Sequence, residues 1–180
     1  MQPGPFVAVL AVPKKGSSMD DDERWMRRAL ELARQGGVDP GSSPIGCVIV
    51  KDGIVLGEGH NEVEKRHDCS AHAEIVTIRR AGEQIKDWEL RGATLYSTLQ
   101  PCGMCSNAII WAKITRVVYG AGRHQVHKMY FEDWHVDTLE FFDDAQRGMI
   151  DVKAGVLAEE CSALYFGPDD ALPVREQANL

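Results

Sequence analysis

Two cysteines, Cys102 and Cys105, lie close together in the stretch PCGMC. A pair at this spacing can form a disulfide, act as a redox couple or bind a metal ion. In a helix that begins at Cys102, residues three apart are neighbours on one side. The positive end of the helix dipole also favours thiolate over thiol there. Two adjacent thiolates suit zinc, which is a borderline-soft cation.

A third candidate ligand is His72 in the stretch SAHAEIV, with Glu74 just after it. Residues two apart do not share a helix face, so we expect these side chains to converge only if the metal lies off the helix N-terminus. The two motifs thus predict a site between two helix N-termini, with His72, Cys102 and Cys105 as zinc ligands. Glu74 would stand beside the open position, where a carboxylate can act as general acid and base.

Cys69 leaves a rival interpretation open. Cys69 and His72 with Cys102 and Cys105 also have the spacing of a closed, four-ligand structural zinc site. Such a site has no room for a water, and the protein would then be a zinc-stabilised binding module. This interpretation gives Glu74 no role. The two remaining cysteines fall in apolar patterns, and we expect them in the core: Cys47 and Cys161.

The order H-x-E followed by P-C-x-x-C is typical of zinc deaminases, and the chain carries it as HAE at 72–74 and PCGMC at 101–105. Over roughly residues 22–166 the sequence resembles the cytidine-deaminase-like superfamily, in the branch of guanine deaminases, fungal cytosine deaminases and tRNA adenosine deaminases. The stretches PIGCVIVKDG, GHN and TLQPCGMCSNAIIWAKITRVVYGA carry the resemblance. The family usually has proline where Cys69 stands.

The resemblance implies an enzyme that removes an exocyclic amine by hydrolysis. Zinc would activate a water, and Glu74 would carry protons to the ring nitrogen and the departing amine. The resemblance also implies that Asn61 hydrogen-bonds the edge of the base and that the backbone amide of Ala73 meets a substrate carbonyl. Members of this branch are usually dimers, so we expect a homodimer.

The segment AGRHQVHKMYFEDWHVDTLEFF bears on the substrate. It resembles a region of guanine deaminases that supplies a second proton shuttle, which implies Glu132 or Asp133 in that role. Phe131 and Trp134 would stack on a purine or pack under the loop. Between 132 and 144 there are acidic residues but no Lys or Arg, and such a flank repels a phosphate backbone. We expect free guanine or a related aminopurine base or nucleoside first, then tRNA adenosine, then cytosine.

Composition agrees with a small-molecule enzyme. The chain has 180 residues, 44% of them hydrophobic, and a formal net charge of −7. This charge disfavours nucleic acid as a partner. The odd number of cysteines, without a secretory signal, argues against a disulfide framework. No apolar run reaches the roughly 18 residues of a membrane span, and we expect a cytoplasmic protein.

Alternating helical and strand patterns must position these residues, and they predict an α/β fold. We expect a three-layer α/β/α sandwich around a central mixed five-stranded sheet. A strong turn signal at Asp52-Gly53 predicts a hairpin over 45–61. Helices are expected over 22–35, 70–81, 102–112, 136–146 and 154–166, and further strands over 93–99, 114–120 and 150–152. Residues 1–21 are interpreted as a flexible leader, 22–166 as the deaminase domain, and 167–180 as a tail that is either a lid or disordered.

Overall fold

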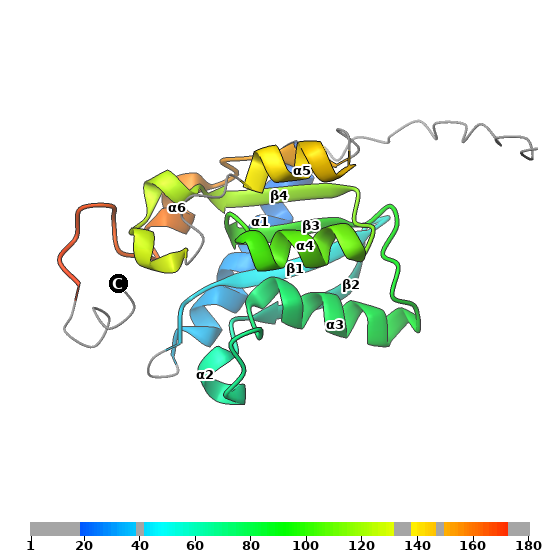
Figure 1. Ribbon diagram of the computed structural model, residues 1–180, viewed down its shortest axis with the longest axis horizontal. Coiled ribbons are helices and arrows are strands. Elements are labelled where there is room, and N and C mark those ends of the chain that lie inside the picture. Colours follow the sequence, from blue (N-terminus) through cyan, green and yellow to red (C-terminus); the bar gives the residue numbers. More distant parts are fainter. Residues whose placement is uncertain (1–18, 39–41, 132–137, 147–149, 173–180) are drawn as a thin grey trace, which may run out of the picture.

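The computed structural model describes residues 19–38, 42–131, 138–146 and 150–172 (Figure 1). Its centre is a five-stranded sheet in the order β2-β1-β3-β4-β5. β1 is antiparallel to both of its neighbours, whereas β3, β4 and β5 are parallel. The sheet is therefore mixed, as the sequence predicted. The strands are β1 Gly46–Lys51, β2 Ile54–His60, β3 Thr94–Leu99, β4 Arg116–Ala121 and β5 Asp151–Lys153.

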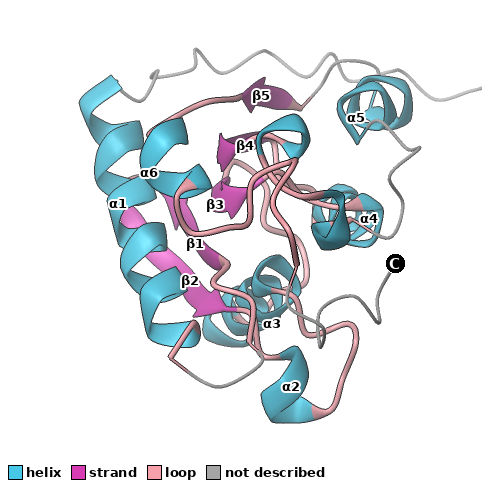
Figure 2. Ribbon diagram, turned by 90° about the vertical axis from the view of Figure 1, so that its left-hand side faces the viewer, coloured by secondary structure: helices cyan, strands magenta, loops and turns pink. Residues whose placement is uncertain are grey.

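Helices cover both faces of the sheet, so the predicted three layers are confirmed (Figure 2). α1 and α6 lie on one face, and α3, α4 and α5 lie on the other. Alternate strand residues separate two cores, because side chains along a strand point to opposite faces. Val48 and Tyr96 join the core under α1, whereas Ile49 and Leu95 join the other. The helices are α1 Met19–Gly36, α2 Val63–Arg66, α3 Ala73–Ile85, α4 Gly103–Trp111, α5 Thr138–Gln146 and α6 Ala158–Ser162.

The predicted hairpin is confirmed at its turn. Lys51 pairs with Ile54, and Asp52 and Gly53 have φ angles of 51° and 76°. Two positive φ values match the tight turn that an Asp-Gly pair favours. Gly46 lets α1 approach the hairpin closely, because a Cβ there would lie 2.0 Å from the carbonyl oxygen of Ala29.

Several predicted boundaries are wrong. α3 begins at Ala73 rather than Ser70, because the Asp68 carboxylate accepts hydrogen bonds from the backbone and hydroxyl of Ser70 (2.8 and 2.7 Å) and holds a turn there. The expected helix over 154–166 is reduced to α6, because Gly155 and Leu157 have left-handed backbones with φ of 79° and 54°. The short α2 was not predicted.

The chain's two ends also differ from expectation where they are described. α1 begins at Met19 and so includes the end of the expected leader. Part of the expected tail is packed, since Leu172 is 9% exposed. Within the described ranges, no helix is both long and apolar enough to cross a membrane.

Candidate metal centre and active site

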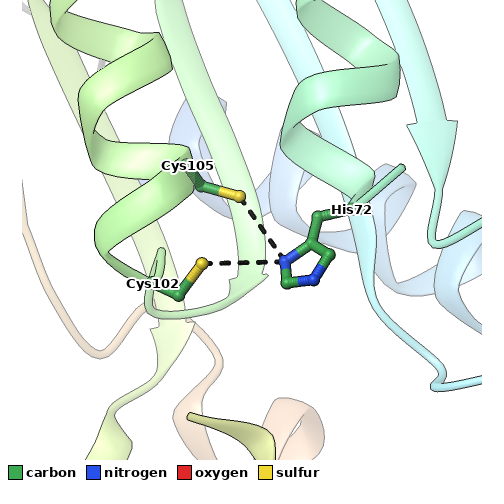
Figure 3. A group of neighbouring side chains, drawn as sticks. All are labelled: His72, Cys102 and Cys105. Carbon is green, nitrogen blue, oxygen red and sulfur yellow. Dashed lines mark hydrogen bonds between the residues drawn. The ribbon is translucent and has the colours of Figure 1, made fainter. Parts of the chain in front are cut away.

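Two helix N-termini meet at the predicted zinc ligands. His72 is the N-cap of α3 and Cys102 the N-cap of α4, both with extended backbones. Cys105 lies in the first turn of α4. Figure 3 shows the imidazole and the two thiols pointing into the space between these helices. Because His72 stands just outside its helix and Glu74 within the first turn, both side chains can reach the same site.

The three ligand atoms have the spacing of a metal site. The Nδ1 atom of His72 lies 3.6 Å from the Sγ of Cys102 and 3.7 Å from the Sγ of Cys105. Tetrahedral zinc, with bonds of about 2.3 Å to sulfur and about 2.05 Å to nitrogen, requires nitrogen and sulfur about 3.6 Å apart. The donor set and its spacing therefore fit zinc, with Nδ1 as the nitrogen that faces the metal. The three residues form a group able to hold a metal ion, with ligand atoms within 4.8 Å of one another.

The two cysteine ligands have opposite pKa shifts. Hydrogen bonds from Cys105 and then from His72 lower the pKa of Cys102 to about 4. The neighbouring Cys102 sulfur and burial raise the pKa of Cys105 above its ordinary value. The pair thus carries one negative charge, and zinc would displace the second proton, since a metal binds thiolates.

Glu74 is a buried carboxylate beside this cluster, with 4% of its surface exposed. Its Oε1 accepts a hydrogen bond from the Ser97 hydroxyl at 3.0 Å, and its Oε2 lies 3.4 Å from the Cys105 sulfur. Burial, and then the charge of Cys102, raise the pKa of Glu74. A carboxyl group with a raised pKa beside the ligand cluster is suited to take up and release a proton.

The residues expected to bind substrate have different positions. Asn61 is 7% exposed, and its backbone N–H donates to the carbonyl of Ile45 at 2.9 Å. Ala73 is the first residue of α3, where a helix leaves its N–H groups without intrahelical partners.

Phe131 is in the core beneath α1, 6% exposed, with the Arg123 guanidinium 5.7 Å from its ring. Its stacking on a purine stays a prediction. Glu132, Asp133 and Trp134 lie outside the described residues.

The other cysteines do not join the cluster. Cys47 and Cys161 are fully buried in the core, as predicted. Cys69 is exposed. Among the residues that the structure describes, the metal-binding group contains His72, Cys102 and Cys105 without Cys69. The geometry thus favours an open, three-ligand site over the closed structural one.

The sequence did not reveal two residues near the site. Ser97 orients Glu74 from the middle of β3, and Glu62 carries a carboxylate that is only 3% exposed. The sequence does contain a signal for Ser97, because Ser97 and Thr98 are consecutive polar residues in a strand that is otherwise apolar after Thr94. Glu62 had no such signal, since it lies in a run of charged residues that reads as solvent-exposed.

Comparison with known proteins supports the assignment of the metal centre. Residues 19–121 match the cytidine and deoxycytidylate deaminase zinc-binding region. A tRNA-specific adenosine deaminase of Haemophilus influenzae is 40% identical over 143 residues, which cover 78% of this chain and 79% of the relative.

Solved structures of both enzyme types are similar to this one. One comes from work on A-to-I editing by tRNA:A34 deaminases, with 34% identity, a TM-score of 0.65, and coverage of 78% of this chain and 98% of the other. Guanine deaminase from Bacillus subtilis is 35% identical, with a TM-score of 0.54 and coverage of 72% and 71%.

Proposed function

We propose that this chain, which belongs to the cytidine and deoxycytidylate deaminase family, hydrolytically deaminates adenosine in a transfer RNA. The observation that supports this choice of substrate is the 40% identity to a tRNA-specific adenosine deaminase over about four fifths of both chains. The similarity extends far beyond the two zinc motifs. This proposal exchanges the first two substrates in the order expected from the sequence alone.

His72, Cys102 and Cys105 would hold the metal. A neutral imidazole and two thiolates offset the charge of Zn²⁺ and leave one position of a tetrahedral set open. When bound, zinc supplies the Lewis acidity that makes a water nucleophilic near neutral pH. The three side chains hold this position at the meeting point of two helix N-termini, which also favours the thiolate form of the cysteines.

Glu74 would move the protons. It takes one proton from the attacking water as the new C–O bond forms at the amino-bearing ring carbon, and delivers it to the adjacent ring nitrogen. It then passes the second water proton to the amine as the C–N bond breaks, so that adenosine and water give inosine and ammonia. Ser97 supports this role, because its bond to Oε1 fixes the carboxylate while Oε2 faces the site.

Asn61 and Ala73 would orient the base. The Asn61 side chain is almost buried, and no described residue hydrogen-bonds its amide group. An amide without a protein partner is available to donate to and accept from the polar edge of a ligand. The Ala73 N–H at the start of α3 offers a second donor close to the zinc ligand His72.

A free aminopurine such as guanine is the second candidate, and the charges near the site favour it. Glu140 and Asp143 are exposed on α5, where they would repel a phosphate backbone. Two arginines that could have formed basic patches, Arg80 and Arg116, instead bind the buried carboxylates Glu62 and Asp22. An uncharged purine base, the substrate of a guanine deaminase, is consistent with this charge distribution.

The deciding experiment supplies zinc-loaded protein with an adenosine-containing anticodon stem-loop or with guanine, and measures ammonia and inosine. The Glu74→Ala variant is the matched control. We expect deamination of the stem-loop that disappears in the variant. Activity on guanine alone would establish the second candidate, and silence on both would overturn the proposal. The chain is also proposed to form a homodimer, which sedimentation can test.

A further inference from the structure

Glu62 is a buried acidic residue that the proposed chemistry does not use. Its Oε1 accepts a hydrogen bond from Arg80 at 2.7 Å, and its Oε2 accepts one from Arg66. The side chain is 3% exposed, whereas both arginines reach solvent. A carboxylate is rarely buried unless its charge is paired. Two guanidinium groups therefore hold the Glu62 carboxylate in place, and we call this group the Glu62 clamp (Glu62, Arg66 and Arg80).

The clamp lies between two residues of the site. Glu62 follows Asn61 directly, and its backbone N–H donates to the carbonyl of Ala71 at 2.9 Å. Ala71 in turn directly precedes His72. One main-chain hydrogen bond thus connects the neighbour of the substrate-binding Asn61 to the neighbour of a zinc ligand, although they are far apart along the chain.

Arg80 extends this connection to the helix that begins at the metal centre. It lies on α3, which starts just after His72. Besides its bond to Glu62, its NH1 group donates to the carbonyl oxygen of Glu58 on β2 at 2.9 Å. A single guanidinium therefore ties α3 to the end of β2, which leads into Asn61. Without the Glu62 carboxylate, this end of the connection would keep only the bond of Arg80 to the Glu58 carbonyl and the main-chain bond to Ala71.

We propose that Glu62 is a positioning residue that sets the location of Asn61 relative to His72, and so the placement of the base against the metal centre. This inference rests on the proposed function, because it assigns Asn61 to the base edge. If Asn61 moves, its hydrogen bond to the base is weakened in the ground state and in the transition state alike. Loss of a binding contact shared by ground state and transition state appears in KM rather than kcat.

The test compares Glu62→Ala with Glu58→Gln in the zinc-loaded protein, on whichever substrate the wild-type enzyme deaminates. Glu58 is a matched control, because its carboxylate also pairs with an arginine, Arg28, but makes no side-chain bond to the Asn61 or His72 segments. We expect Glu62→Ala to raise KM about 10-fold with little change in kcat. Zinc content should stay at about one ion per chain, and Glu58→Gln should match the wild type.

A double mutant separates positioning from general destabilisation. If Glu62 acts through Asn61, adding Glu62→Ala to Asn61→Ala should leave KM unchanged from that of Asn61→Ala. Glu62→Asp should recover part of the lost affinity. Equal KM for Glu62→Ala and Glu58→Gln, or full additivity with Asn61→Ala, would overturn the inference. An inactive wild-type protein would instead overturn the proposed function.

Discussion

Two buried carboxylates, Asp22 and Glu74, lie on opposite faces of the sheet in opposite electrostatic surroundings. Asp22 on α1 is fully buried, and Arg116 donates to both of its oxygens at 2.7 and 2.9 Å. Lys153 and Tyr96 add bonds of 2.6 and 3.1 Å. Glu74 is almost as deeply buried, but the described side chains that contact its carboxylate are a hydroxyl and a thiol, those of Ser97 and Cys105.

This difference is consistent with a structural role for Asp22 and with the proton transfer proposed for Glu74. Asp22 is paired with two cationic side chains, Arg116 and Lys153, so it ties α1 to the first residue of β4 and the last residue of β5. Glu74 lacks such compensation and its pKa is raised by burial. A raised pKa favours the uptake of a proton by this carboxylate, and perturbed acids of this kind cluster at functional sites. The contrast can be tested by changing each residue in turn.

The largest expected effect is on turnover. Glu74→Gln keeps the shape of the side chain but removes its proton-transfer chemistry, so we expect kcat to fall about 10²- to 10⁴-fold. Ammonia release measures this loss, and metal analysis should show zinc still bound. Asp22→Asn, assayed below its unfolding temperature, should retain near wild-type kcat. Equal losses in both variants would erase the proposed distinction.

The next effect is on stability. Asp22→Asn leaves Arg116 and Lys153 without their shared anion, and breaking a buried ion pair costs about 3–5 kcal/mol. We expect the lower end, because Arg116 keeps Asp151 at 3.0 Å and the Lys153 side chain is 35% exposed. Urea unfolding gives the free energy. Asp151→Asn is the matched control, since it changes an exposed partner of the same arginine and should cost less than about 1 kcal/mol. A loss as small for Asp22→Asn would contradict the structural role.

In zinc-free protein, replacing Glu74 should change the free energy of unfolding in the opposite direction and stabilise the fold. Because its pKa is raised in the folded state, folding favours the protonated form, and ionised Glu74 destabilises the fold. Below the unfolded pKa of about 4.3 there is no penalty, and the penalty grows as pH rises towards the folded pKa. Glu74→Gln should therefore unfold at higher urea than the wild type at neutral pH, with a gap that closes on acidification. A lower midpoint at neutral pH would show that Glu74 stabilises the empty site.

A smaller effect accompanies metal binding. Cys102, with a pKa of about 4, is already a thiolate at pH 7, whereas Cys105 keeps its proton. Zinc binding should thus release about one proton rather than two. Calorimetry in buffers of different ionisation enthalpy counts the protons, and Glu74→Gln as the titrated protein removes any contribution from that carboxylate. Release of two protons would mean that a second ligand, Cys102 or His72, also begins protonated.

The smallest effect is expected at Cys69. Cys69→Ser should retain zinc and activity, because this exposed side chain is outside the ligand cluster. Zinc analysis after dialysis is sufficient, with Cys102→Ser as the variant that should lose the metal. Loss of zinc from Cys69→Ser would revive the closed structural site.

The sequence predicted those parts whose chemistry is local. The ligand triad follows from H-x-E and P-C-x-x-C, because each motif lies within one helix start and few other reactions need that set of side chains. The turn at Asp52-Gly53 follows from backbone preferences of two adjacent residues, and the sheet from apolar alternation. The prediction of a helix over 154–166 was wrong, because Leu157 adopts a left-handed backbone that its residue type does not reveal.

Only the tertiary structure paired the polar groups. Asp22 meets Arg116 and Lys153 across 94 and 131 positions of the chain, and Ser97 meets Glu74 from a different element. Glu62 and Arg80 looked like solvated charges until the fold placed them together. A motif specifies which side chains are present, and local patterns specify the elements that carry them. Which carboxylate receives a cation and which is left to exchange protons depends on long-range packing, and this packing is what makes Asp22 structural and Glu74 suited to catalysis.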